Sequence, residues 1–213
     1  MARSFNGSQY CQWANSSNFD SDGIFTVSCW AYTVNVTAEA WAFGPASVAS
    51  TACGMLGFRG DAANDPVMLY HRVGGTVGAP TKTSYLANTW HHLCGVSNSA
   101  TNHLMYLDGV VGTTNTTNVG GISCTHMYAG SFIENNTRST YLNGRVMQCA
   151  AWDAALTAAE VASLAKGFSP SRIRPQSLIF YDPCIKVMRS ITGRVGTLTD
   201  NAGYTDQHRS YGL

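Results

Sequence analysis

Charge is scarce in this chain. Of its 213 residues, only 13 are lysine or arginine and 12 are aspartate or glutamate, so the formal net charge is +1. A surface that binds nucleic acid needs clustered basic residues to neutralise phosphates, and no basic stripe interleaved with aromatic residues occurs before residue 168. We therefore expect no nucleic-acid partner, and a surface covered mainly by neutral polar side chains.

Long apolar runs are also missing. The first residues, from Met1 to Gly7, lack the apolar stretch of a signal peptide. No segment approaches the roughly 20 apolar residues that cross a bilayer as a helix. We expect no membrane partner and no Sec-type export, so the protein should be made in the cytoplasm and stay soluble.

The cysteines offer no recognisable framework for a metal or a disulfide network. There are seven, which is an odd number, and no C-x-x-C pair occurs. Cys29, Cys94 and Cys149 lie inside apolar runs, where a cysteine usually acts as a small buried hydrophobic residue. We predict that the cysteines are reduced and structural.

Glutamate is scarce, and this argues against an enzyme of the glycosidase type. Only Glu39, Glu134 and Glu160 are present, and none has a carboxylate two residues away. A glycosidase needs two carboxylates that face one cleft, and on a strand residues two apart share a face. We therefore predict that the protein is not an enzyme.

Alternating patterns predict many short strands. From Phe25 to Val34, small apolar residues alternate with aromatic and polar ones, which indicates a half-buried strand. Residues 90–96 and 103–107 predict a hairpin pair that ends at Asp108-Gly109, a strong tight-turn dipeptide. Further strands are expected at 55–59, 67–71, 110–114, 123–131 and 178–181.

One short helix is expected near residues 158–166. Thr157 and Glu160 have the spacing of a capping box, in which each side chain satisfies a backbone amide of the first turn. Gly167 ends the helix. The pattern places on its buried side Ala158, Val161, Leu164 and Ala165. We expect this helix to cover one end or edge of a sandwich.

The composition changes at Phe168. The stretch that follows has prolines at 170 and 175 and reads as an extended connector. Six of the 13 basic residues lie in this part, against three acidic ones. We predict a domain over residues 1–167 and a C-terminal extension over 168–213 that consists of a connector, a strand and an arm.

Four motifs, in this order, resemble the LamG-like jelly roll of the concanavalin A-like lectin and glucanase group. They are F-T-V-S-C-W at 25–30, W-H-H-L-C-G-V at 90–96, Y-L-D-G at 106–109, and the strand and helix from Gly144 to Leu164. The resemblance covers about residues 1–167 and implies an all-β, two-sheet antiparallel jelly-roll sandwich. It fixes no single function, because this fold hosts lectins, adhesion modules, glycosidases and virion proteins.

The extension after Gly167 is similar to segments that follow such domains in proteins of tailed bacteriophages and prophages. This resemblance implies a virion structural protein, such as a capsid decoration protein bound to capsid or other virion proteins. The protein would form a homo-oligomer on the particle. The candidate attachment residues are Arg172, Arg174, Arg189, Arg194 and Arg209.

The alternative function is glycan binding, for example to a host-surface polysaccharide. Aromatic rings on an open sheet face can stack on the apolar face of a sugar. The candidate residues are Trp30, Tyr32, Trp41 and Tyr70. Tryptophans in a sandwich are more often part of the core, so both interpretations remain open.

No cofactor is expected, and calcium is the one metal for which candidate ligands exist. Related lectin and laminin-type domains hold calcium through loop oxygens. Asp20 with Asp22, and Asp61 with Asn64 and Asp65, would supply such oxygens, although both groups also suit ordinary turns. His91 and His92 are adjacent on a strand and point to opposite faces, so they do not predict a shared metal site.

Overall fold

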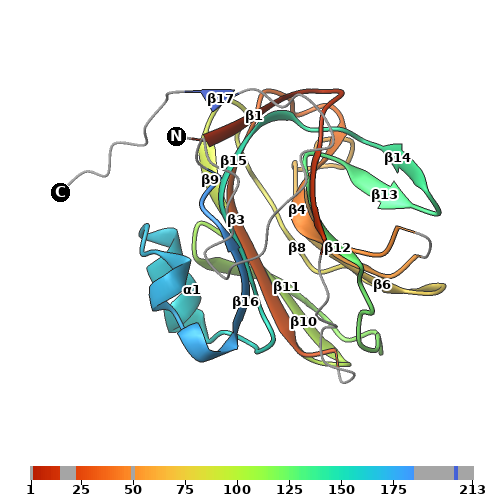
Figure 1. The fold of residues 1–213 in the computed structure, drawn as a ribbon, viewed down its shortest axis with the longest axis vertical. Coiled ribbons are helices and arrows are strands. Elements are labelled where there is room, and N and C mark those ends of the chain that lie inside the picture. Colours follow the sequence, from red (N-terminus) through yellow and green to blue (C-terminus); the bar gives the residue numbers. More distant parts are fainter. Residues whose placement is uncertain (1, 15–22, 49–50, 185–203, 206–213) are drawn as a thin grey trace.

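The protein is a sandwich of two antiparallel sheets, seen in a computed structural model that describes residues 2–14, 23–48, 51–184 and 204–205 (Figure 1). The first sheet contains, in spatial order, β11 (Val110–Asn115), β10 (Asn102–Leu107), β9 (Trp90–Ser99), β3 (Phe25–Thr33), β15 (Asn143–Trp152), β1 (Ala2–Asn6) and β17 (Tyr204–Thr205). An eighth strand, β16 (Leu178–Asp182), pairs with β15.

The second sheet packs against the first. Its spatial order is β2 (Cys11–Ala14), β12 (His126–Ala129), β4 (Glu39–Ala46), β5 (Cys53–Arg59), β6 (Val67–Val73) and β7 (Thr76–Gly78), with β8 (Thr81–Lys82) also paired to β6. A separate hairpin consists of β13 (Phe132–Glu134) and β14 (Thr137–Ser139). The predicted all-β jelly-roll sandwich is therefore confirmed.

The alternation in β3 arises because one of its faces meets the second sheet. Phe25, Val27, Cys29 and Ala31 are fully buried in the main core. On the other face, Thr26 donates a hydrogen bond to the carbonyl of Ala154 and accepts one from the amide of Leu156. The predicted strand is thus present, and its polar face is used to fix the chain that leads into the helix.

The predicted hairpin of β9 and β10 is confirmed, and so is the predicted turn at Asp108-Gly109, which joins β10 to β11. Asp108 and Gly109 have φ values of 52° and 81°, which glycine and aspartate tolerate better than most residues. The Asp108 carboxylate accepts a hydrogen bond from the His92 amide at 2.8 Å and lies 2.7 Å from Nδ1 of His91. These two contacts connect the turn to the start of the neighbouring strand β9.

The helix α1 (Ala158–Ala165) has the predicted capping box, and Val161 and Leu164 are buried. It packs over the outer face of the first sheet, on the opposite side of the molecule from the β13–β14 hairpin (Figure 1). The prediction was wrong for Ala158, which is exposed, and Ala165 is only partly covered. The reason is that just one side of this two-turn helix reaches the sheet.

The chain after α1 returns to the sandwich. Two 3₁₀ turns, η1 (Pro170–Arg172) and η2 (Pro175–Ser177), lead into β16, where Phe180, Tyr181 and Asp182 are buried. The strand predicted at 178–181 is therefore present. A division after Gly167 would separate β16 from β15, its partner in the same sheet.

All seven cysteines are free and buried, and Cys29, Cys94 and Cys149 are fully inaccessible, as predicted for small hydrophobic residues. Among the residues that the structure describes, no helix is long and apolar enough to cross a membrane.

Candidate functional site

The outer face of the second sheet carries a cluster of three aromatic rings. Trp41 comes from β4, Tyr70 from β6 and Phe132 from β13. The centroid of the Trp41 ring lies 5.6 Å from that of Tyr70 and 5.0 Å from that of Phe132, and the last two are 5.9 Å apart. The β13–β14 hairpin covers only part of this face, so the cluster borders an open pocket.

The pocket has a volume of about 310 Å³. Its lining residues are Glu39, Trp41, Arg59, Met68, Tyr70, Phe132, Ser139 and Thr140. Strand register brings them together: Glu39 of β4 lies opposite Arg59 of β5. The Trp41 indole forms the floor of the pocket. Gly57 makes room for this ring, because a Cβ at position 57 would lie 2.7 Å from it. The ring can lie across β5 only because no side chain is there.

A network of charged groups forms one wall of the pocket. Arg59 donates two hydrogen bonds to Asp61, at 2.8 and 2.9 Å, and its Nε lies 3.7 Å from the Glu39 carboxylate. The bonds from Arg59 hold the pKa of Asp61 below its usual range. Burial raises the pKa of Glu39, and the attraction of Arg59 offsets only part of that effect.

Thr140 has an unusual conformation at the edge of the pocket. Its φ of 47° is rare for a β-branched residue, and its carbonyl accepts a hydrogen bond from the Trp41 amide at 3.3 Å. The Thr140 hydroxyl is buried and has no hydrogen-bond partner within the described part of the chain. A buried polar atom without a partner is costly, and such strain tends to occur at functional sites.

The four predicted glycan-binding residues fall into two separate places. Trp41 and Tyr70 meet in the pocket, as described above. Trp30 lies in the first sheet and is only 3% exposed, packed against His92. Tyr32 is half-buried on the same strand, beside Trp90 and Arg145. The structure therefore does not assemble the four rings into one surface.

The pocket also contains residues that the sequence analysis did not select. Phe132 lies just beyond a strand that was predicted to run to Ser131, and Glu39 and Arg59 were not considered as a pair. One signal was available: Phe132 is a large aromatic residue at the start of a polar, turn-rich segment. Its partner strand was not evident from the local sequence.

Those predicted metal ligands that lie within the described residues do not form a metal-binding cluster. The Asp61 carboxylate is taken up by Arg59, and the Asp65 carbonyl accepts backbone hydrogen bonds from Ser84 and Tyr85. Asp20 and Asp22 lie outside the described residues. Within residues 2–14, 23–48, 51–184 and 204–205, no group of three or more His, Cys, Asp or Glu side chains could hold a metal ion.

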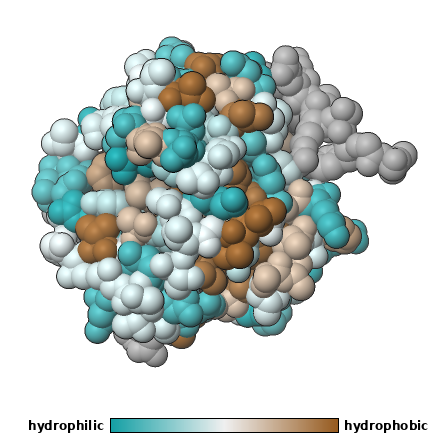
Figure 2. All heavy atoms as spheres, turned by 180° about the vertical axis from the view of Figure 1, so that it is seen from behind, coloured by the Kyte–Doolittle hydropathy of each residue, from teal (hydrophilic) through white to brown (hydrophobic). Residues whose placement is uncertain are grey.

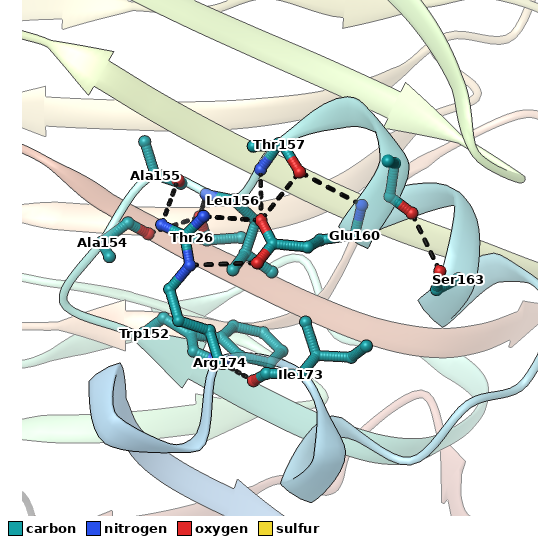
Figure 3. A network of polar contacts seen from close by, with 11 residues as sticks. Thr26, Trp152, Ala154, Ala155, Leu156, Thr157, Glu160, Ser163, Ile173 and Arg174 are labelled. Atoms are coloured by element: carbon teal, nitrogen blue, oxygen red, sulfur yellow. Dashed lines mark hydrogen bonds and ion pairs between the residues drawn. The ribbon is translucent and has the colours of Figure 1, made fainter.

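Two of the five predicted attachment arginines are described. Arg174 points inward: it forms an ion pair with Glu160 at 2.7 Å and donates to the Ala155 carbonyl at 2.9 Å, so that it ties the connector to the capped end of α1 (Figure 3). Arg172 is exposed at the end of η1. The positions of Arg189, Arg194 and Arg209 are outside the described residues.

Few large apolar side chains are exposed among the described residues. Seen from behind, hydrophobic residues form several patches separated by polar areas (Figure 2). The exposed ones among the described residues are Val34, Leu86, Val110, Val111 and Phe168. Phe168 is 56% exposed and borders a shallow depression that is also lined by Lys166 and Arg172.

The fold and this geometry can be compared with known proteins. The model of the concanavalin A-like lectin/glucanases superfamily matches residues 5–162, which is well over half of the chain. No curated protein sequence matches this chain.

Solved structures with the same fold include proteins of several kinds. A putative carbohydrate-binding protein from Bacteroides ovatus has a TM-score of 0.72 at 16% identity, over 99% of this chain and 61% of that one. A heptameric SAP-like pentraxin from Limulus polyphemus has a TM-score of 0.63 at 16% identity, over 85% and 91%. The CBM40 domain of a Ruminococcus gnavus sialidase, bound to α2,3-sialyllactose, has a TM-score of 0.54 at 10% identity, over 76% and 97%.

Proposed function

Because the chain belongs to the concanavalin A-like lectin/glucanases superfamily, we propose that it is a non-catalytic carbohydrate-binding protein whose site is the pocket of Trp41, Tyr70 and Phe132. The observation that carries this proposal is the meeting of three aromatic rings with polar groups in one open cavity. Structural neighbours described as carbohydrate-binding support it.

The chemistry of the pocket suits a sugar ring. A pyranose has an apolar C–H face, which packs on an aromatic ring, and a rim of hydroxyl groups, which need hydrogen-bond partners. Tyr70 and Phe132 are half-buried, so their rings are partly accessible, while the nearly buried Trp41 forms the floor. The volume of about 310 Å³ lies at the lower end of the range of about 300–1,000 Å³ typical of small-molecule sites.

A binding role without catalysis is supported by the lining of the pocket. A glycosidase needs two carboxyl groups that face one cleft, one that carries a proton and a second that acts as a base or nucleophile. Among the described lining residues, Glu39 is the only one with a carboxylate, and both oxygens of the nearby Asp61 are bound by Arg59. We propose that these groups orient a ligand and do not hydrolyse it.

Truncation of the accessible rings is the experiment that tests this proposal. Tyr70→Ala and Phe132→Ala are each expected to weaken glycan binding about tenfold, because an aromatic contact contributes about 0.5–1.5 kcal/mol beyond its buried area. A glycan array would identify a ligand for the wild-type protein, and calorimetry would give the dissociation constants.

Two control variants make the result specific. Tyr70→Phe keeps the ring and should bind within about twofold of the wild type. Tyr32→Ala removes an aromatic residue of the first sheet and should have no effect. If Tyr32→Ala abolishes binding while Tyr70→Ala does not, the site lies on the first sheet and the proposed pocket is wrong.

A second candidate function is a virion structural role, in which the protein decorates a phage particle. The observation that favours it is the exposed surface of Lys166, Phe168 and Arg172 directly after α1, where the similarity to phage proteins begins. An aromatic ring beside two cations is a suitable contact for another protein. Capsid proteins or further copies of this chain would be the partners.

Particle association tests this second role. Phe168→Ser combined with Arg172→Ser is expected to release the protein from particles during sedimentation, at unchanged thermal stability, because both side chains are exposed. A chain that ends at Cys184 separates this surface from Arg189, Arg194 and Arg209. If neither variant changes the amount that cosediments with particles, the C-terminal attachment is wrong.

A further inference from the structure

Arg59 is the only basic residue among the described residues that line the pocket, and its charge is already neutralised. Arg59 donates from Nε and Nη2 to the two carboxylate oxygens of Asp61, at 2.8 and 2.9 Å. Its Nη1 is directed to the sulfur of Met68, 3.9 Å away, and the Glu39 carboxylate lies 3.7 Å from its Nε. The Nε–Nη2 edge of the guanidinium, which can bind a carboxylate through two hydrogen bonds, is therefore occupied by Asp61 and closed to the carboxylate of a ligand.

The charges at this wall add up to an excess of negative charge. One guanidinium faces the two carboxylates of Glu39 and Asp61, which leaves one net negative charge. The next ion pair along the sheet, Arg72 with Glu134 at 2.7 Å, is neutral as a unit. An anion that entered the pocket would meet like charge in partly desolvated surroundings, where screening by water is reduced.

Two polar groups at the pocket, the Glu39 carboxylate and the Thr140 hydroxyl, are suited to hydrogen bonds with hydroxyl groups of a ligand. The Glu39 carboxylate receives no hydrogen bond from any described residue, and its side chain is 30% exposed. The Thr140 hydroxyl, which borders the same pocket, is buried and has no hydrogen-bond partner in the described part of the chain. A carboxylate accepts hydrogen bonds only, so its natural partners are the O–H groups of an uncharged polyol.

We propose that the pocket selects neutral sugars and rejects uronic and sialic acids. The sugar hydroxyls would donate to Glu39 and exchange a hydrogen bond with Thr140, while Asp61 keeps Arg59 from binding a ligand carboxylate. This inference rests on the proposed function, since it specifies the ligand class of the same site. It also contrasts with the sialyllactose bound to the CBM40 structure.

Paired neutral and acidic ligands provide the test: two pairs differ only in the acidic group, and the third differs by one sialic acid residue. The wild-type protein would be titrated with galactose and galacturonic acid oligomers of equal length, with glucose and glucuronic acid oligomers, and with lactose and α2,3-sialyllactose. We expect the neutral member of each pair that binds to have a dissociation constant at least about tenfold lower, which corresponds to about 1.4 kcal/mol.

A charge variant tests the cause of the selectivity. Glu39→Gln combined with Asp61→Asn leaves Arg59 as the only charge at this wall and should reduce or reverse the preference by at least about tenfold. Asp153→Asn removes an exposed carboxylate elsewhere and should leave the preference unchanged. Thermal unfolding of each variant would show that the fold is kept.

The outcomes separate this inference from the proposed function. If the wild-type protein binds the acidic member of a pair as tightly as the neutral one, or more tightly, and Tyr70→Ala weakens that binding, the pocket is a glycan site but its neutral selectivity is wrong. If no member of any pair binds, and the array also shows no ligand, both proposals fail. A neutral preference that survives Glu39→Gln with Asp61→Asn would contradict the role given to the charges.

Discussion

A chain that ends at Gly167 is expected not to fold. This truncation removes β16, which pairs along β15 near the centre of the first sheet. The buried side chains of Phe180, Tyr181 and Asp182 are lost with it. Phe180 packs on Trp13 and Phe43, with ring centroids 5.5 and 5.6 Å apart, so the loss reaches the core between the sheets.

Two buried indoles would also lose their hydrogen-bond acceptors. Trp13 donates to the Asp182 carboxylate at 2.9 Å, and Trp152 donates to the Ile173 carbonyl at 2.8 Å (Figure 3). Each unsatisfied buried donor costs about 1–3 kcal/mol, and each lost aromatic side chain costs about 1.5–3 kcal/mol of burial. The sum is comparable with the total stability of about 5–15 kcal/mol that domains have.

Circular dichroism and thermal unfolding of chains of different length would check this prediction. The matched control is a chain that ends at Cys184, which keeps β16, both indole acceptors and the Arg174 to Glu160 ion pair. It should unfold cooperatively, in contrast to the shorter chain. A chain of residues 1–167 with a normal unfolding transition would show that the domain does end at residue 167, as the sequence predicts.

The sequence predicts the fold well wherever the pattern is local. The alternation of β3, the Asp108-Gly109 turn and the Thr157 to Glu160 capping box each lie within ten residues, and all three are present in the structure. β4 was missed because both of its faces are buried, which removes the alternation from its sequence. Its position between β12 and β5 depends on pairings between distant segments.

The candidate site was only half predictable for the same reason. Trp41 and Tyr70 were selected as aromatic residues. Nothing in the local sequence shows that their strands, β4 and β6, lie on either side of β5 in the same sheet. Trp30 has an equally suitable sequence context, yet its ring is buried against His92. Phe132 reaches Trp41 only because the β13–β14 hairpin folds back over the second sheet. A periodic sequence pattern predicts a strand but not where that strand packs.

A second large effect is expected from acid, at a pair of buried histidines. His71 of β6 and His103 of β10 are both inaccessible to solvent, and their Nδ1 atoms are 3.3 Å apart. Nε2 of His71 lies 3.0 Å from the Gly120 carbonyl, and Ser97 lies 2.9 Å from Nδ1 of His103. Burial, with a smaller contribution from His103, lowers the pKa of His71 from 6.5 to about 4.

This shift makes the free energy of unfolding depend on pH. The unfolded chain takes up a proton at His71 near pH 6.5, whereas the folded protein does so only near pH 4. Stability is therefore complete above pH 6.5 and falls as the pH drops toward 4, where the loss from this one residue reaches about 3 kcal/mol.

Urea unfolding between pH 7.5 and pH 4 would measure the effect. His71→Gln removes the titrating ring, so it should lower stability at pH 7 but flatten the fall of stability with decreasing pH. His126→Gln is the matched control, because His126 lies near the surface and is only partly covered. Burial also lowers the pKa of His126, but its ring is much less covered than that of His71, so the profile of this variant should flatten only slightly. If the His71→Gln profile runs parallel to the wild-type profile instead, the acid sensitivity arises elsewhere, and the buried histidine pair takes up its proton without cost to the fold.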